Sequence, residues 1–192
     1  MLRALLFVVA FLPALALAQG PAPVSTDAPA EARQFDFMLG EWRVEVRPKV
    51  SGMAAMIHGA PRLVGSWKVW PAFDGFGVED ELRIVDASGN PASLSRTQRL
   101  WSRSEQRWLV AGMDVYRGRM SSARGHWADD AMLVEGSGVD AEGKAYSTRT
   151  RFSGISADAF AMIQDRSTDG GASWDEAVLE VSATRTAAAA TR

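Results

Sequence analysis

Residues 35–46 read F-D-F-M-L-G-E-W-R-V-E-V, and the hydrophobic period changes in the middle of this stretch. Phe35, Met38 and Leu39 are spaced i, i+3 and i+4, which predicts one or two helical turns with an apolar face. Gly40 predicts the end of the helix, because glycine adopts the left-handed conformation without a Cβ clash. After the glycine, apolar and charged residues alternate, as in a half-buried strand. The stretch therefore predicts a short helix that runs through a glycine hinge into the first strand of a sheet.

The rest of the chain has the pattern of an antiparallel β protein. Strand-like runs recur at intervals of about ten residues, separated by turn residues, which favours a meander over βαβ units. They cover roughly 62–70, 77–85, 94–102, 107–115, 117–125, 131–136, 145–152, 160–167 and 176–184. We expect about ten strands and one short N-terminal helix, closed into a barrel because closure removes the sheet edges. A two-sheet sandwich is the alternative.

The N-terminus predicts export. Residues 1–18 have one early charge, an apolar run and small residues at the end, which is typical of a secretory signal peptide cleaved after Ala18. A retained membrane anchor is the alternative, but the apolar run is shorter than the ~20 residues of a bilayer span. Residues 19–30 are a Pro/Ala-rich linker, 31–187 a single barrel domain and 188–192 a disordered tail. We expect the mature protein in the periplasm or the medium, away from the membrane.

Composition excludes several kinds of chemistry. The chain has no cysteine and therefore no disulfide or thiol chemistry. Its net charge of −2 argues against a nucleic-acid partner. The two histidines, His58 and His126, have no second ligand at metal spacing, so we expect no zinc. Nucleotide-binding and nucleophile-elbow motifs are absent from the sequence, and no catalytic residue is assigned.

The pattern F-D-F-x-x-G-x-W at residues 35–42 resembles the opening of a bacterial protein family of unknown function, whose members are exported or cytosolic. The Trp101 and Trp108 hairpin and the C-terminal S-x-D-G-G-x-S-W turn also look like that family. The same Gly40-x-Trp42 pattern is similar to that of calycins and lipocalins, where the Trp closes the barrel base. The resemblance implies that a basic residue on the last strand, here Arg185, packs across Trp42 as a cation–π pair; a solvent-exposed Arg185 is the alternative.

The calycin resemblance also brings haem into consideration, because some short calycin-like barrels bind it through a histidine. Neither histidine of this chain lies on a clearly inward strand face near the C-terminus. We therefore expect no cofactor.

Residues 167–174, S-T-D-G-G-A-S-W, resemble the Asp-box hairpin of sialidases and other propellers. A lone copy cannot build a propeller, which needs repeated blades. We therefore expect a β-hairpin in which Asp169 bonds turn amides and Trp174 packs beneath.

The inward faces of the strands decide what the barrel can hold. On 62–70 we expect the face with Leu63 and Trp67 to point inward, whereas on 107–115 the pattern leaves the choice open. Charged side chains on alternate positions are ordinarily a solvated outer face. In the alternative, some of them turn inward as a polar floor for an anionic head group, beside aromatic residues that hold an apolar body. The candidate ligand-binding residues are then Trp67, Arg96, Gln98, Trp108, Tyr146, Arg149, Arg151 and Phe160.

The sequence thus favours an exported barrel that binds a small, partly apolar ligand and is not itself an enzyme. An enzyme that uses the same cavity is a rival hypothesis, and a buried carboxylate such as Glu81 or Asp114 near an inward arginine would be its first sign. The other rival is a structural or partner-binding protein whose barrel is filled by its own side chains. The loop at 48–61 is either a lid or binding loop or an irregular insertion.

Overall fold

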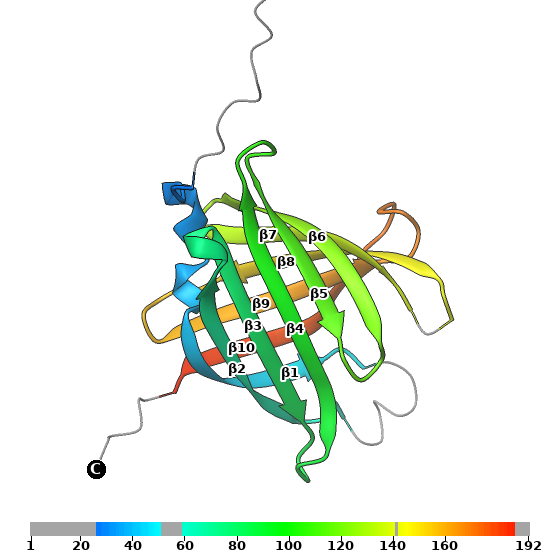
Figure 1. Ribbon diagram of the computed structural model, residues 1–192. Helices are drawn as coiled ribbons and strands as arrows, with labels where there is room; N and C mark the ends of the chain where they lie inside the picture. Colours follow the sequence, from blue (N-terminus) through cyan, green and yellow to red (C-terminus); the bar gives the residue numbers. More distant parts are fainter. Residues whose placement is uncertain (1–25, 51–58, 141, 187–192) are drawn as a thin grey trace, which may run out of the picture.

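The computed structural model describes residues 26–50, 59–140 and 142–186, and Figure 1 shows that these form one β-barrel. The ten strands are β1 (Gly40–Pro48), β2 (Leu63–Ala72), β3 (Gly77–Val85), β4 (Pro91–Ser102), β5 (Arg107–Asp114), β6 (Arg119–Ala128), β7 (Ala131–Val139), β8 (Ala145–Ser153), β9 (Ala159–Ser167) and β10 (Asp175–Arg185). Each strand pairs antiparallel with its neighbours in sequence, and β10 pairs with β1 to close the barrel. The predicted meander barrel is confirmed, and the sandwich alternative is wrong.

Short 3-10 helices lie before β1. The predicted short N-terminal helical segment is present as two 3-10 helices, η1 (Ala30–Arg33) and η2 (Asp36–Met38), and a third, η3 (Phe73–Gly75), follows β2. Gly40 has a φ of 112° and is the first residue of β1, as expected for a glycine hinge. A Cβ at this position would stand 2.7 Å from Nη1 of Arg185.

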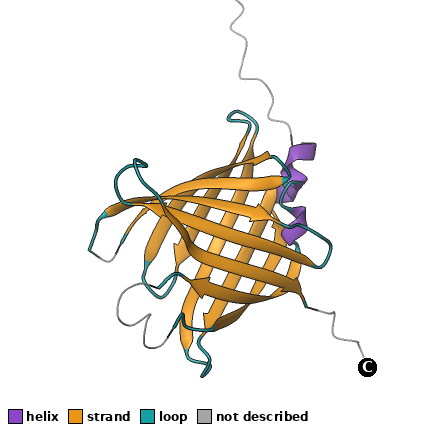
Figure 2. Ribbon diagram, turned by 180° about the vertical axis from the view of Figure 1, so that it is seen from behind, coloured by secondary structure: helices purple, strands orange, loops and turns teal. Residues whose placement is uncertain are grey.

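The barrel has two different ends. We call the end with η1 and η2, where β1 begins, the closed end, and the end where β1 stops at Pro48 the open end. Figure 2 shows the helices gathered at one end of the barrel. By the order of the strands, the hairpin loops β3–β4, β5–β6 and β9–β10 lie at the opposite end. In a meander every second connection returns to the same end, which puts the Asp-box hairpin at the open end.

Aromatic side chains fill the closed half. Phe35 and Met38 of the helical segment are fully buried, and the Phe35 ring meets the Trp108 indole edge-on at 4.7 Å. The Trp108 Nε1 donates a hydrogen bond of 3.0 Å to Oε1 of Gln34, which ties η1 to β5. The packed cluster includes Phe35, Phe37, Trp42, Trp67, Trp101, Trp108, Phe152 and Phe160. This end of the barrel is therefore plugged by the chain's own side chains.

Trp42 and Arg185 form the contact that the calycin resemblance implies. The Arg185 guanidinium carbon lies 4.1 Å from the centroid of the Trp42 ring, and the two residues are paired across the β1–β10 seam. Arg185 also donates to the carbonyl oxygens of Leu39 at 2.8 Å and Ala157 at 2.6 Å. The Trp42 Nε1 donates to the Met38 carbonyl at 2.6 Å. The alternative of a solvent-exposed Arg185 is wrong.

The Asp-box segment forms the β9–β10 hairpin. The Asp169 carboxylate accepts hydrogen bonds from the Ser173 amide at 3.0 Å and from the hydroxyls of Ser173 at 2.6 Å and Ser167 at 2.7 Å. The Trp174 ring lies under the guanidinium of Arg149, whose carbon is 4.4 Å from the ring centroid. The residues thus shape a turn, as their sequence predicts.

These hydrogen bonds predict the pH response of the hairpin. They lower the pKa of Asp169 well below its usual value, and the Ser173 hydroxyl is the largest cause. Because the folded pKa is lowered, the carboxylate's contribution to stability is complete above about pH 4 and is lost as the pH falls through the folded pKa. We expect the ¹³C carboxyl resonance of Asp169 to titrate below the value of about 3.9 found in peptides. A midpoint at or above that value would contradict the hydrogen-bond assignment.

Candidate functional site: an interior cavity in the open half

A cavity of about 210 Å³ lies inside the barrel in its open half. Its polar lining includes Arg99, Tyr146, Thr148, Thr150 and Gln164. Its apolar lining comes from Val110, Val134, Phe152 and Met162. The volume is below the 300–1,000 Å³ of drug-sized pockets. It corresponds to roughly seven water molecules at their volume in the liquid.

Small residues lie on the inner face of β5, β6 and β7, where the wall of the barrel is closely packed. Ala123 on β6 pairs with Gly136 on β7, and Gly112 on β5 pairs with Ser121 on β6. A Cβ at Gly136 would come within 2.9 Å of the Ala123 Cβ. A Cβ at Gly138 would come within 2.5 Å of the Tyr146 hydroxyl, so the Tyr146 ring lies against that glycine. The glycines therefore let neighbouring side chains of this wall approach closely, and Ser121, Ala123 and Gly136 are the small residues of this set that line the cavity.

Arg99 lies at the inner end of the cavity and is buried with a carboxylate partner. Its Nη1 pairs with Oδ2 of Asp80, and the Trp67 Nε1 donates to Oδ1 of the same carboxylate at 2.9 Å. The exposed fraction is 5% for Arg99 and 1% for Asp80. The Arg99 guanidinium also stands over the Phe35 ring, at 5.2 Å from its centroid. Arg99 thus joins the plug of the closed half to the cavity of the open half.

The guanidinium of Arg99 has donors to spare. An arginine side chain carries five N–H donors, and among the described residues the Asp80 contact is the one hydrogen bond made by the Arg99 side chain. Since Arg99 lines the cavity, its other N–H groups can meet an acceptor there. The charge itself is already balanced by Asp80.

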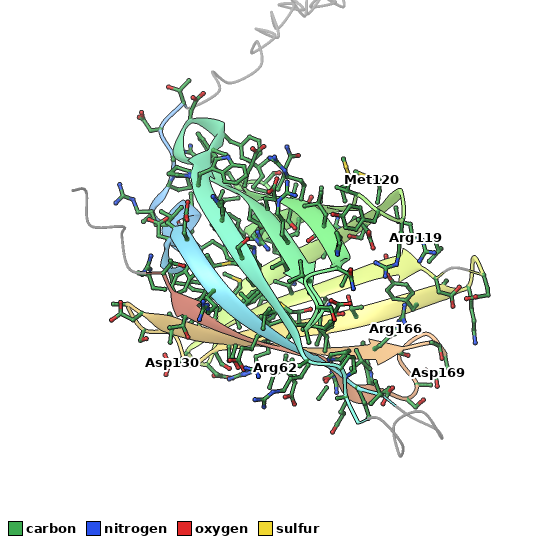
Figure 3. All side chains as sticks on the ribbon, turned by 90° about the horizontal axis from the view of Figure 1, so that it is seen from below. Arg62, Arg119, Met120, Asp130, Arg166 and Asp169 are labelled. Atoms are coloured by element: carbon green, nitrogen blue, oxygen red, sulfur yellow. The ribbon has the colours of Figure 1, made fainter. Side chains whose placement is uncertain are left out.

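A row of paired residues runs from Arg99 around the wall to a second arginine. The inner-face partners in successive strands are Arg99, Val110, Ala123, Gly136, Thr148 and Arg166. Arg166 is half-buried near the open end, and its guanidinium carbon lies 3.8 Å from the centroid of the Tyr146 ring. Arg119, at the start of β6, is half-buried at the same end (Figure 3).

The predicted aromatic residues lie mostly outside this cavity. Trp67 points inward as expected, and so do Phe160 and Trp108, whose strand face the sequence left open, but all three are packed in the filled closed half. Their contribution is to the plug, and they are not among the residues that line the cavity. Tyr146 is the one predicted residue that does line it.

The inward polar floor is wrong for Arg96, Gln98, Arg149 and Arg151. All four lie on the outer face of the barrel, as the solvated-face alternative has it. Arg96 pairs with Glu81 at 2.8 Å, Gln98 donates to Glu79 at 2.7 Å and Arg149 donates to Asp165 at 2.7 Å. Arg151 is exposed on the outer face next to them. The prediction was wrong because these residues come from the most highly charged face of each strand, and that face is the one exposed to solvent.

The period-two alternation of side-chain direction along a strand predicts that Arg99 and Gln164 point into the barrel. On β4, Arg99 is two residues from Trp101 and therefore shares its inward face. On β9, Gln164 and Arg166 share a face with Phe160 and Met162 in the same way. The rule that the face with aromatics points inward was sufficient on both strands.

The two carboxylates that would signal an enzyme lie elsewhere. Glu81 is on the outer face, where its hydrogen bond with Arg83 and its pairing with Arg96 lower the pKa of its carboxyl. Asp114 pairs with Arg117 at 2.9 Å at the end of β5. The buried carboxylate beside an inward arginine is Asp80, and its two oxygens are occupied by Arg99 and Trp67.

His126 lies on the outer face of β6, between the inward residues Gly125 and Trp127, and His58 lies outside the described residues. Within the described ranges, no group of three or more His, Cys, Asp or Glu side chains is arranged to hold a metal ion. No described helix is both long and apolar enough to span a bilayer. Of the loop at 48–61, positions 51–58 lie outside the described residues, as do the proposed signal peptide and the last six residues.

Comparison with known proteins leaves the site to be interpreted from its own geometry. No model of a known protein family matches the chain. No curated protein matches it either.

Proposed function

We propose that this protein is an exported, calycin-like binding protein that holds a small, partly apolar ligand in the interior cavity of its open half. The observation that carries the proposal is the cavity itself, which residues of β4 to β9 line with both polar and apolar side chains. A barrel built for stability alone is expected to be close-packed throughout, since voids cost free energy. Here the closed half is packed in that way, whereas a cavity remains among residues of β4 to β9.

The cavity lining has the mixture typical of small-molecule sites. Val110, Phe152 and Met162 supply apolar contacts, while Arg99 and Gln164 supply polar groups that orient a ligand. Gln164 already donates to Thr150 Oγ1 at 3.0 Å, so its side chain is held in place before a ligand arrives. The cavity volume favours a small metabolite over a long lipid chain or a macrocycle.

Export and the calycin relationship rest on other observations. The signal-peptide pattern of residues 1–18 supports delivery to the periplasm or the medium. The Trp42–Arg185 contact and the glycine hinge at the barrel base support the resemblance to calycins. Fold analogy raises the probability of ligand binding without specifying a ligand.

Native mass spectrometry of the protein purified from an exporting host tests the proposal. We expect a population with additional mass, released as a small molecule by collisional activation or by denaturation. A protein that carries no small molecule and whose cavity resonances respond to none of a set of small metabolites would contradict it.

Filling the cavity is expected to abolish binding. Ala123→Leu puts a larger side chain on the inner wall, whereas the control Ala111→Leu makes the same change on the exposed outer face of β5. We expect Ala123→Leu to lose the bound mass and Ala111→Leu to retain it, with both variants folded by circular dichroism. Equal retention in the two variants would place the ligand outside the cavity.

A further inference from the structure

A groove of about 690 Å³ lies on the outer face of β1, β2 and β3, outside the barrel. Its lining includes Arg43 and Ser66, which are exposed and alternate along their strands with the buried Val44 and Trp67. None of its lining residues lines the interior cavity. Its volume falls within the roughly 300–1,000 Å³ of small-molecule sites. The groove is therefore a second candidate site, and the barrel wall separates it from the first.

Short side chains on β2, between longer ones on β1 and β3, give the groove its shape. Ser66 is the cross-strand partner of Arg43 on one side and of Arg83 on the other. Val64, the next outward residue of β2, pairs with Glu45 on β1. Strands are spaced about 4.8 Å apart, so the backbones that carry the two arginines are about 10 Å apart. The groove thus runs along β2 and has a guanidinium on either side of the Ser66 hydroxyl.

Charged groups in the groove are left without partners from the chain. Arg43, Glu45 and Arg62, which lies just before β2 (Figure 3), take part in no ion pair within 4.0 Å in the described part of the chain. Every Asp and Glu of the sequence is among the described residues. Arg83 binds Glu81 through its Nε at 2.6 Å, which leaves the N–H groups of its two terminal nitrogens for a ligand.

The two carboxylates of the groove differ in what they can bind. Asp86 accepts hydrogen bonds from the backbone amides of Ser88 at 2.8 Å and Asn90 at 2.9 Å, and from the Asn90 side chain at 2.9 Å. Its carboxylate is therefore occupied by its own turn. Glu45 is two residues from Arg43 on the same face of β1, a spacing of about 7 Å. Along the groove, an available carboxylate thus lies next to the position between the two guanidinium groups.

We propose that this groove binds a phosphoethanolamine group, with its phosphate between Arg43 and Arg83 and its ammonium at Glu45. A guanidinium donates two parallel hydrogen bonds to phosphate oxygens, and the Ser66 hydroxyl is a further donor between them. The two-carbon linker of the ligand places its ammonium beside its phosphate, which matches the adjacent positions of Glu45 and Arg43. The inference is independent of the proposed function, because the two sites share no residue.

O-phosphoethanolamine and propyl phosphate test the ammonium separately from the phosphate. They have nearly the same shape, but propyl phosphate has a methyl group in place of the ammonium and carries the larger negative charge. Attraction to arginines alone therefore favours propyl phosphate. We expect phosphoethanolamine to bind at least about fivefold more tightly to the full mature protein at neutral pH and low salt. Titration followed by amide chemical shifts is expected to move Val64 and Ser66 and to leave Ala123, in the cavity, unchanged.

Two substitutions separate the two ends of the ligand. Glu45→Gln is expected to remove the preference, because it weakens phosphoethanolamine and leaves propyl phosphate bound as tightly or more tightly. Arg43→Gln is expected to weaken both ligands at least about fivefold. Arg47→Gln and Glu180→Gln are the matched controls, because these residues are cross-strand partners on the same exposed face and do not line the groove. Both controls are expected to bind both ligands as the wild type does.

Vesicles distinguish the two sources of the group. Phosphatidylcholine vesicles are sedimented with the protein, with and without phosphatidylethanolamine. Sedimentation that phosphatidylethanolamine increases assigns the group to a lipid headgroup. Sedimentation that it does not change, together with binding of free phosphoethanolamine, assigns the group to a soluble ester.

Several results would overturn the inference. These are equal or weaker binding of phosphoethanolamine relative to propyl phosphate, binding of neither phosphate, a preference that survives Glu45→Gln, and equal losses in Arg43→Gln and Arg47→Gln. Shifts confined to the cavity residues would overturn it as well. Should Glu45→Gln fail to fold, the comparison of the two phosphates on the wild type decides, because the groove without a carboxylate contact prefers the more negative ligand.

Discussion

Replacing Asp80 by leucine is expected to lower the free energy of unfolding by about 3–5 kcal/mol, because it leaves the buried Arg99 guanidinium without a counter-charge. The same change removes the acceptor of the Trp67 indole hydrogen bond, which adds an unpaired buried donor. For a domain of this size the loss corresponds to a fall in Tm of roughly 6–20 °C. Urea unfolding followed by tryptophan fluorescence measures it.

The double variant Asp80→Leu/Arg99→Leu is the control for this prediction. Removing both charges avoids the isolated buried ion, and such replacements are often neutral or stabilising. We expect the double variant to recover most of the stability that Asp80→Leu loses. The single variant Arg99→Leu completes the cycle. If the losses in free energy of unfolding for Asp80→Leu and Arg99→Leu add up to the loss for the double variant, the pair is not coupled and the burial argument is wrong.

Trp42→Ala is expected to lower the free energy of unfolding by about 3–5 kcal/mol, because removing a fully buried tryptophan side chain leaves a cavity. Trp42 is 1% exposed and meets the Phe160 ring at 4.8 Å. Its loss also frees the Arg185 guanidinium from its ring partner and the Met38 carbonyl from its donor. Chemical denaturation with calorimetric melting measures the effect.

Trp127→Ala provides the comparison for Trp42→Ala. Trp127 is 39% exposed, although its ring also contacts Phe37 at 6.3 Å. We expect Trp127→Ala to lower the free energy of unfolding by well under half of the loss caused by Trp42→Ala. Equal losses for the two tryptophans would show that the seam between β1 and β10 carries no special share of the stability.

The fold was predictable because period-two alternation extends over most of the chain. β3 begins and ends at the predicted residues, and the turn before β7, at Asp129 and Asp130, was marked by its acidic residues. The boundaries that differ lie at strand ends, where β4 starts three residues earlier and β7 runs three residues further than the pattern indicated. Backbone pairing across the sheet continues there even where the side-chain alternation stops.

The site was less predictable because composition does not show which end of the barrel is filled. Trp67 and Trp108 were assigned to ligand contact, but the helical segment brings Phe35 and Met38 into the same space and completes a packed core. The contacts between the helical segment and the strands join residues far apart in the sequence, such as Gln34 and Trp108, which are 74 positions apart and hydrogen-bonded. Local sequence patterns show whether a strand residue points into the barrel. They do not show whether the space that it enters is already filled by the helical segment.

Arg99 and Asp80 show the limit of treating charge as a surface property. Each is in phase with inward apolar residues on its strand, Trp101 for Arg99 and Val78 for Asp80. Two opposite charges on the inner faces of adjacent strands can be buried together because they neutralise one another. A search for complementary charges in inward phase on neighbouring strands would have found the pair.

The most direct test of the central claim is to locate a bound probe by NMR, using methyl-labelled protein and 1-hexanol, a small molecule with an apolar chain and one polar group. The account predicts intermolecular nuclear Overhauser effects from the hexanol chain to Val110, Ala123 and Met162, which line the cavity, and none to Ala111 or Ile163 on the outer face. Contacts to the outer-face methyls with none to the interior set would contradict it.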